Sequence, residues 1–162
     1  MTRGSSRWSE FRRRGGLWVA AQSILFAATA ATAVVGPRWP ADAQLPLSIA
    51  SGLLTGLGLA FALWAYRSLG SAFTPYPRPQ PGAPVVETGP YRLVRHPIYG
   101  GALLLFAGIS LAFSYTSLAP TAALAVLWWK KSLTEERFLT ERFPGYADYR
   151  RRTRRRFFPY LY

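Results

Sequence analysis

The sequence contains no cysteine, one histidine and seven acidic residues, and each scarcity excludes a kind of chemistry. Without cysteine, the chain can form no disulfide, no thiolate metal site and no cysteine nucleophile. With His96 as the single histidine, few side chains remain to ligate a metal ion, so we predict no metal site. The 162 residues are enough for one domain and no more, so we expect a single domain over 1–162.

Basic residues are abundant, and they are clustered. Of the 20 Lys and Arg residues, five lie in 1–16, four in 67–97 and ten in 130–162, and only Arg38 lies elsewhere. These segments alternate with apolar runs, which is the positive-inside pattern of membrane proteins rather than the pattern of a nucleic-acid-binding surface. We therefore predict an integral membrane protein, in a bacterial inner membrane, with three cytoplasmic segments and both termini in the cytoplasm.

Apolar runs predict an all-α fold: a polytopic membrane protein with about four transmembrane helices. The first run has 19 residues without a charge, about 28 Å as a helix, which is enough to span the hydrocarbon core. The last two runs are shorter, so we expect them to form a helical hairpin that turns at 114–117. The four predicted helices are 17–35, 45–66, 98–113 and 118–129.

The predicted helices divide the chain into two N-terminal spans (1–66), an inner loop (67–97), the hairpin (98–131) and a cytoplasmic helical tail that binds a cofactor (132–162). Prolines at alternate positions predict a loosely ordered stretch at 71–84, whereas the aromatic and apolar residues of 85–97 predict a packed one.

Three local features refine these helices. Gly52 and Gly56, with Gly58 nearby, predict close packing of the second helix. Lys130 and Lys131 are expected to extend the fourth helix and to snorkel toward the membrane surface. A separate helix is predicted at 132–143, and another helical turn at 146–149.

Two motifs stand at the feet of the predicted hairpin. RHPIYGG occupies 95–101 and EERFL occupies 135–139, with 33 residues between them. A hairpin brings both motifs to the same membrane face, so cationic and aromatic side chains meet two carboxylates. Such a set could bind a ligand with an amino-acid carboxylate, hydroxyls and a flat base, because Arg pairs with carboxylates, Glu accepts from hydroxyls or an ammonium, and Tyr stacks.

With the residues before them, these motifs resemble the isoprenylcysteine carboxyl methyltransferase family and its phospholipid N-methyltransferase relatives. That family's pattern is RHPxYxG, an apolar stretch and EExxL, and every fixed position is present here. Residues 142–149 also resemble the family's C-terminal segment, and the likeness covers roughly 64–160. The resemblance implies an integral membrane methyltransferase that uses S-adenosylmethionine.

The resemblance also implies the roles of individual residues. The catalytic residues implied are Arg95, Glu135 and Glu136. The cofactor-binding residues implied are Tyr91, Val94, Arg95, His96, Pro97, Tyr99, Gly101, Glu135 and Glu136.

Each of these residues also has a purely structural interpretation. His96 could cap the third helix, Arg95 could anchor it at the inner face, and Tyr99 could be an interfacial aromatic. Glu135 and Glu136 could pair with nearby Lys or Arg residues. Because adjacent residues point about 100° apart on a helix, we expect one glutamate to face the ligand and the other to form a salt bridge.

The acceptor is expected to be lipophilic or membrane-delivered: an isoprenylcysteine-like carboxylate, a phospholipid amine or another small acceptor. We expect its pocket to open toward lipid between helices 17–35 and 45–66, and the arginine run 150–156 to contact anionic lipid headgroups. Two alternatives remain at this stage. One is a membrane reductase that uses NADPH and is related to sterol reductases, and the other is a non-enzymatic membrane scaffold.

Overall fold

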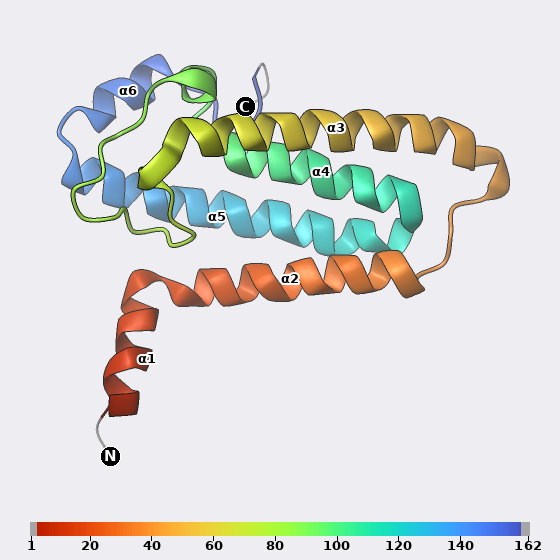
Figure 1. Cartoon of the computed structure of the whole chain (residues 1–162), viewed down its shortest axis with the longest axis horizontal. Coiled ribbons are helices and arrows are strands. Elements are labelled where there is room, and N and C mark those ends of the chain that lie inside the picture. Colours follow the sequence, from red (N-terminus) through yellow and green to blue (C-terminus); the bar gives the residue numbers. More distant parts are fainter. Residues whose placement is uncertain (1–2, 160–162) are drawn as a thin grey trace.

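Four long helices lie side by side in a computed structural model, which describes residues 3–159 (Figure 1). No strand occurs within that range. The helices are α1 (Arg3–Arg14), α2 (Gly16–Val35), α3 (Gln44–Leu69), α4 (Pro97–Phe113), α5 (Leu118–Arg142) and α6 (Tyr146–Arg152), with short 3-10 turns at Ala41–Ala43, Gly70–Ala72, Gly89–Arg92 and Tyr115–Ser117.

The bundle has two different ends. One end, which we call the loop end, carries the long α3–α4 connection, the last turns of α5 and helix α6 (Figure 1). At this end α1 runs at a steep angle to α2, with Gly15 at the junction in a left-handed conformation of φ +89°. A side chain on Gly15 would also collide with Pro77, because its Cβ would lie 2.5 Å from that ring. The junction therefore requires glycine twice over.

The predicted helices are confirmed, with two differences: two of them are continuous, and one further helix, α1, was not predicted. The fourth predicted helix and the helix predicted at 132–143 form one continuous helix, α5, because no Pro or Gly separates them. Helix α1 was not predicted, because residues 3–14 contain no apolar run. In the structure its Trp8 and Phe11 rings stack, with centroids 5.4 Å apart.

Hydroxyl and indole groups close the end opposite the loop end. The predicted turn at 114–117 is confirmed, and Ser114 Oγ donates a hydrogen bond to the Pro37 carbonyl over 2.7 Å. Trp39 Nε1 donates to the Ser110 carbonyl over 3.2 Å. These bonds tie the α2–α3 connection to the α4–α5 turn and satisfy backbone groups at the helix ends.

The closest helix contact lies between α3 and α4, but not at the glycine pair that we predicted. Gly52 and Gly56 face open space, so their predicted packing role is wrong. Gly58 lies at the interface instead, where an added Cβ would be 2.6 Å from the Gly101 carbonyl oxygen. Gly108 is packed in the same way against Thr55. The sequence motif was misassigned because helix rotation, rather than glycine spacing, decides which side faces the neighbour.

Two helices are long and apolar enough to cross a membrane, namely α2 and the stretch Ala41–Ala72 that contains α3. Only 11% of each apolar window is buried inside the protein, so their apolar side chains mostly face outward. The shorter helix α4 is also apolar. The architecture is that of a polytopic helical membrane protein.

The glycine contact generates a prediction. Gly58→Leu forces a side chain into the α3–α4 interface, and we expect it to lower the free energy of unfolding by about 1–3 kcal/mol, the usual cost of overpacking. Gly52→Leu, on the open side of the same helix, is the matched control and should leave stability nearly unchanged. Thermal unfolding of both variants in detergent measures the difference, and equal melting temperatures would contradict the interface.

Candidate active site

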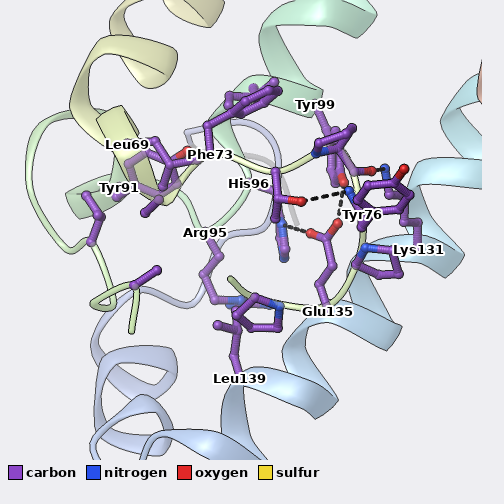
Figure 2. Close-up of a pocket in the computed structure, with 18 of the residues that line it drawn as sticks. Leu69, Phe73, Tyr76, Tyr91, Arg95, His96, Tyr99, Lys131, Glu135 and Leu139 are labelled. Carbon is purple, nitrogen blue, oxygen red and sulfur yellow. Dashed lines mark hydrogen bonds and ion pairs between the residues drawn. The ribbon is translucent and has the colours of Figure 1, made fainter. Parts of the chain in front are cut away.

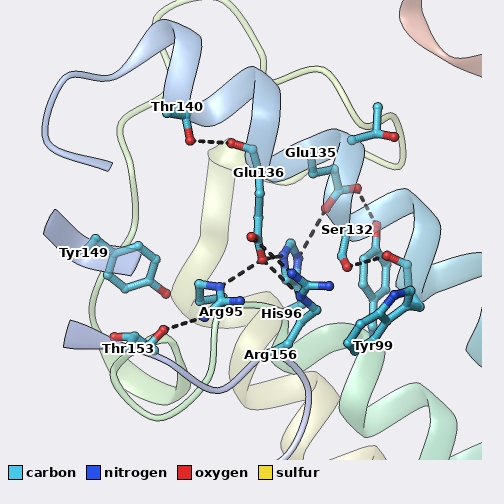
Figure 3. Close-up of polar contacts among 12 residues, drawn as sticks. Arg95, His96, Tyr99, Ser132, Glu135, Glu136, Thr140, Tyr149, Thr153 and Arg156 are labelled. Carbon is cyan, nitrogen blue, oxygen red and sulfur yellow. Dashed lines mark hydrogen bonds and ion pairs between the residues drawn. The ribbon is translucent and has the colours of Figure 1, made fainter. Parts of the chain in front are cut away.

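The two motifs meet at the loop end, where α4 begins beside the polar extension of α5 (Figure 3). Arg95 Nε donates a hydrogen bond to Glu136 Oε1 over 2.9 Å, and His96 Nε2 lies 3.2 Å from the same oxygen. The side chains of Arg95, His96 and Glu136 are only 7%, 7% and 4% exposed. The prediction that the hairpin brings the two motifs together is confirmed.

Glu135 and Glu136 divide the two roles that their helical rotation predicts. Glu135 Oε1 accepts a hydrogen bond from the Tyr99 hydroxyl over 2.5 Å, and Glu135 Oε2 lies 3.3 Å from His96 Nδ1. Glu135 faces the main cavity of the protein (Figure 2). Glu136 instead makes the buried salt bridge with Arg95. Glu135 is therefore the glutamate that faces the main cavity.

His96 lies between the two glutamates, which favour its protonated form. Burial by itself lowers the pKa of His96, but hydrogen bonds to Glu135 and then Glu136 outweigh it and raise the pKa above the ordinary 6.5. Burial likewise opposes ionisation of Glu136, yet His96 and Arg95 lower its pKa to about 2. Because each ring nitrogen faces a carboxylate, His96 donates on both sides and has no free lone pair for a substrate proton.

An aromatic stack fixes the position of Tyr99. Its ring lies nearly parallel to the His96 ring, with centroids 5.6 Å apart, and to the Trp128 ring, with centroids 5.3 Å apart. These ring contacts restrict rotation of the Tyr99 side chain and so help to keep its hydroxyl directed at Glu135.

The C-terminal tail was predicted to belong to the site, but its direct contacts with the first motif were not. Arg95 Nη1 donates to the carbonyls of Thr153 and Arg154, over 2.8 and 2.5 Å. The backbone N–H of His96 donates to the Arg156 carbonyl over 2.8 Å. Arg156 Nε also lies 3.3 Å from Glu136 Oε1. Part of the arginine run that we expected to contact lipid therefore holds the first motif in place.

The main cavity has a volume of about 260 Å³ and adjoins both motifs (Figure 2). Its size is close to the lower end for small-molecule sites, about 300–1,000 Å³. Burial, followed by Tyr149 and Glu135, raises the pKa of Tyr91, so that hydroxyl stays neutral. Five of the predicted site residues line the cavity: Tyr91, Arg95, His96, Tyr99 and Glu135.

Four predicted cofactor-binding residues are absent from the cavity lining: Glu136, which is in the buried salt bridge, and Val94, Pro97 and Gly101. Val94 is fully buried in the interior, and Pro97 is the buried first residue of α4. Gly101 packs against α3, where an added Cβ would lie 2.6 Å from the Ala62 nitrogen. The geometry of Gly101 therefore favours a role in close helix approach.

The cavity walls differ from the predicted ones. Helix α2 contributes Gln22 and Phe26, as expected, but nothing in 45–66 lines the cavity. The wall that we expected from 45–66 is formed instead by residues 70–86, a segment that we call the strap (Figure 2). We had predicted loose order for 71–84, yet the strap supplies a continuous wall whose lining residues include Phe73, Tyr76 and several prolines.

A buried lysine of α5, Lys131, joins the strap to α2 and α5 by hydrogen bonds. Lys131 is 1% exposed, so the prediction that it snorkels to the surface is wrong. Its Nζ donates to the Pro75 carbonyl over 2.8 Å and to Gln22 Oε1 over 3.3 Å. Trp128 Nε1 donates to the same Gln22 oxygen over 2.8 Å. A polar residue in an apolar helix, Gln22, was the sequence signal for this cluster.

Comparison with known proteins gives two findings. A family model described as "Phospholipid methyltransferase" matches residues 47–145. The protein named "Cobalt-zinc-cadmium resistance protein CzcN", from Cupriavidus metallidurans, is 35% identical over 130 residues. That match covers 76% of this chain and 55% of the relative, so the chain spans about half the length of the curated relative.

The buried salt bridge generates a prediction. Glu136→Gln leaves Arg95 without its carboxylate, and we expect a loss of about 3 kcal/mol in the free energy of unfolding. Because the pKa of Glu136 falls from 4.5 to about 2 on folding, its contribution is complete above pH 4.5 and is lost as the pH falls toward 2. The stability difference between wild type and variant should therefore shrink across that window. Unfolding of Glu141→Gln, at a glutamate with a 62% exposed side chain, is the control.

A second prediction concerns the hydrogen bond between Lys131 and the strap. Lys131→Met removes the hydrogen bond to the Pro75 carbonyl, and we expect amide hydrogen exchange in 70–86 to become about tenfold faster, since bonds to charged groups contribute about 1.5–3 kcal/mol. Lys130→Met, at the exposed neighbour, is the matched control. Unchanged exchange in Lys131→Met would show that the strap is held by other contacts.

Proposed function

Because the chain belongs to the phospholipid methyltransferase family, we propose that it is a membrane methyltransferase that uses S-adenosylmethionine and a lipophilic acceptor. One observation supports this most directly. Residues from both motifs, Tyr99 and Glu135 among them, border a single cavity, while Glu136 and Arg95 hold the motifs together. A site assembled from two motifs around a space for a ligand is what a cofactor-dependent enzyme requires.

The groups that line the cavity suit this cofactor. Glu135 presents a carboxylate to an ammonium or to ribose hydroxyls, and tyrosines such as Tyr91 and Tyr146 present flat rings to a base. Lys131 also lines the cavity, and its ammonium supplies positive charge for a carboxylate. When bound, S-adenosylmethionine supplies a methyl group on a positively charged sulfur, which an acceptor can take by direct displacement.

The protein's part in such a reaction is positioning and exclusion of water. Nε and Nη1 of Arg95 are already bonded to Glu136 and to tail carbonyls, so we assign Arg95 and Glu136 to positioning. The strap forms one wall of the cavity, and we propose that it helps to hold the reactants in line and to limit the access of water.

Glu135 is the group we assign to proton transfer. An amine or thiol acceptor must lose a proton, whereas a carboxylate acceptor need not. His96 cannot take that proton because both of its nitrogens face carboxylates. Glu135 lines the cavity and is oriented by Tyr99, so its carboxylate is the group placed to receive one.

Access from the bilayer explains a lipophilic acceptor. The cavity includes Gln22 and Phe26 of α2, a helix whose apolar surface mostly faces outward. The basic segments gather at the loop end, and by the positive-inside rule this supports our proposal that this end and both termini lie in the cytoplasm of a bacterial cell. The acceptors we consider are an isoprenylcysteine-like carboxylate, a phospholipid amine or another small acceptor. CzcN is named for metal resistance, and that name specifies no acceptor.

Cofactor binding tests the proposal directly. Isothermal titration of the purified protein with S-adenosylmethionine should show binding, and Glu135→Gln should weaken it about tenfold or more through loss of a charged hydrogen bond. Glu141→Gln, on the same helix but outside the main cavity, should bind as the wild type does.

Two results would overturn the proposal. One is absence of binding by a wild-type protein that unfolds cooperatively. The other is stabilisation by NADPH but not by S-adenosylmethionine. Thermal unfolding of Glu135→Gln separates lost binding from lost folding.

A further inference from the structure

A second cavity, of about 400 Å³, lies beside the buried salt bridge. Arg95 borders both cavities, but Glu136 rather than Glu135 faces this one. It is formed by α5, α6 and the tail. Its lining residues are Arg95, Leu133, Glu136, Arg137, Thr140, Glu141, Arg150 and Arg156.

Positive charge is in excess around the second cavity, with four arginines and two glutamates. Arg137 pairs only loosely, with 4.0 Å between its Nε and Glu141 Oε1. Arg150 forms no ion pair within residues 3–159. Buried Nη1 of Arg156 has no hydrogen-bond partner in the same range. A phosphate-type anion would supply what these guanidinium groups lack.

An exposed apolar stripe on α5 leads to the cavity. Val126, Trp129 and Leu133 are 57%, 47% and 48% exposed, and their spacing of three and four residues puts them on one side of the helix. The stripe continues to Arg137 at the next turn. Arg156 lies above the Trp129 ring, with its Cζ 4.5 Å from the ring centroid, so charge and apolar surface are continuous.

We propose that this surface is a binding site for an anionic phospholipid, distinct from the methyl-transfer cavity. Its phosphate lies among Arg137, Arg150 and Arg156, and an acyl chain lies along the stripe of α5. Free phosphate would use only the arginines and leave the exposed stripe uncovered. The tail also carries Arg156, which contacts Glu136. A bound lipid would therefore stabilise the same tail that completes the active site.

The experiment uses the full chain in a neutral detergent, titrated with dioctanoyl phosphatidylglycerol and followed by native mass spectrometry. Arg137→Gln/Arg150→Gln should raise the apparent Kd about thirtyfold, because each basic residue near an anionic lipid contributes about 1 kcal/mol and the variant removes two. Arg12→Gln/Arg13→Gln removes the same charge from α1 and should change the Kd less than about twofold by the same reasoning. Val126→Ser/Leu133→Ser should also weaken lipid binding, since it removes the apolar half of the site.

Three results would overturn the proposal: an unchanged Kd in Arg137→Gln/Arg150→Gln, an equal loss in the α1 control, or inorganic phosphate that displaces the lipid at equal concentration. Dioctanoyl phosphatidylcholine should bind more weakly than the anionic lipid, and equal binding would also count against it. Thermal unfolding confirms that each variant is folded. No step requires S-adenosylmethionine, so the outcome is independent of the proposed methyl transfer.

Discussion

The buried carboxylate of Glu136 is the constraint on which the rest of the site depends. A charge this deeply buried is tolerated only when it is paired and hydrogen-bonded. Arg95 and His96 come from the start of α4, and Arg156 comes from the tail, so satisfying one carboxylate brings three distant segments together. Arg95 also holds the tail in place, because its Nη1 donates hydrogen bonds to the backbone carbonyls of 153–154. Folding of the tail and assembly of the site are thus the same event.

Helical geometry explains why the adjacent residues Glu135 and Glu136 have different surroundings. Because Glu136 is committed to the interior, its neighbour Glu135 must point about a quarter-turn away, and that direction is the main cavity. His96 lies between them, shared by a structural and a cavity-facing carboxylate that both favour its protonated form. Two chemically identical neighbours therefore differ in their surroundings: Glu136 forms a buried salt bridge, and Glu135 faces the main cavity.

Much of the fold could be predicted from the sequence because apolar length and flanking charge are local properties. The four long helices, the turn at 114–117 and the meeting of the two motifs follow from them. What could not be predicted depends on long-range contacts. Gly58 rather than Gly52 faces α4 because of how α3 is rotated in the bundle, and Lys131 is buried because Gln22 and Pro75 arrive from elsewhere to bind it. The strap has no helical or strand periodicity, so nothing in its own residues shows that it forms a wall.

The backbone contact at Gly58, Gly101 and Gly108 also limits how the protein can move. At these glycines backbone atoms of α3 and α4 approach each other closely, which leaves the two helices little room to slide or compress. The cavity can widen only where side chains mediate the packing, at the strap and at α2. The strap and α2 are thus two separate places at which the cavity could open. A soluble donor and a membrane-dissolved acceptor would then arrive by different routes, with no competition for the same opening.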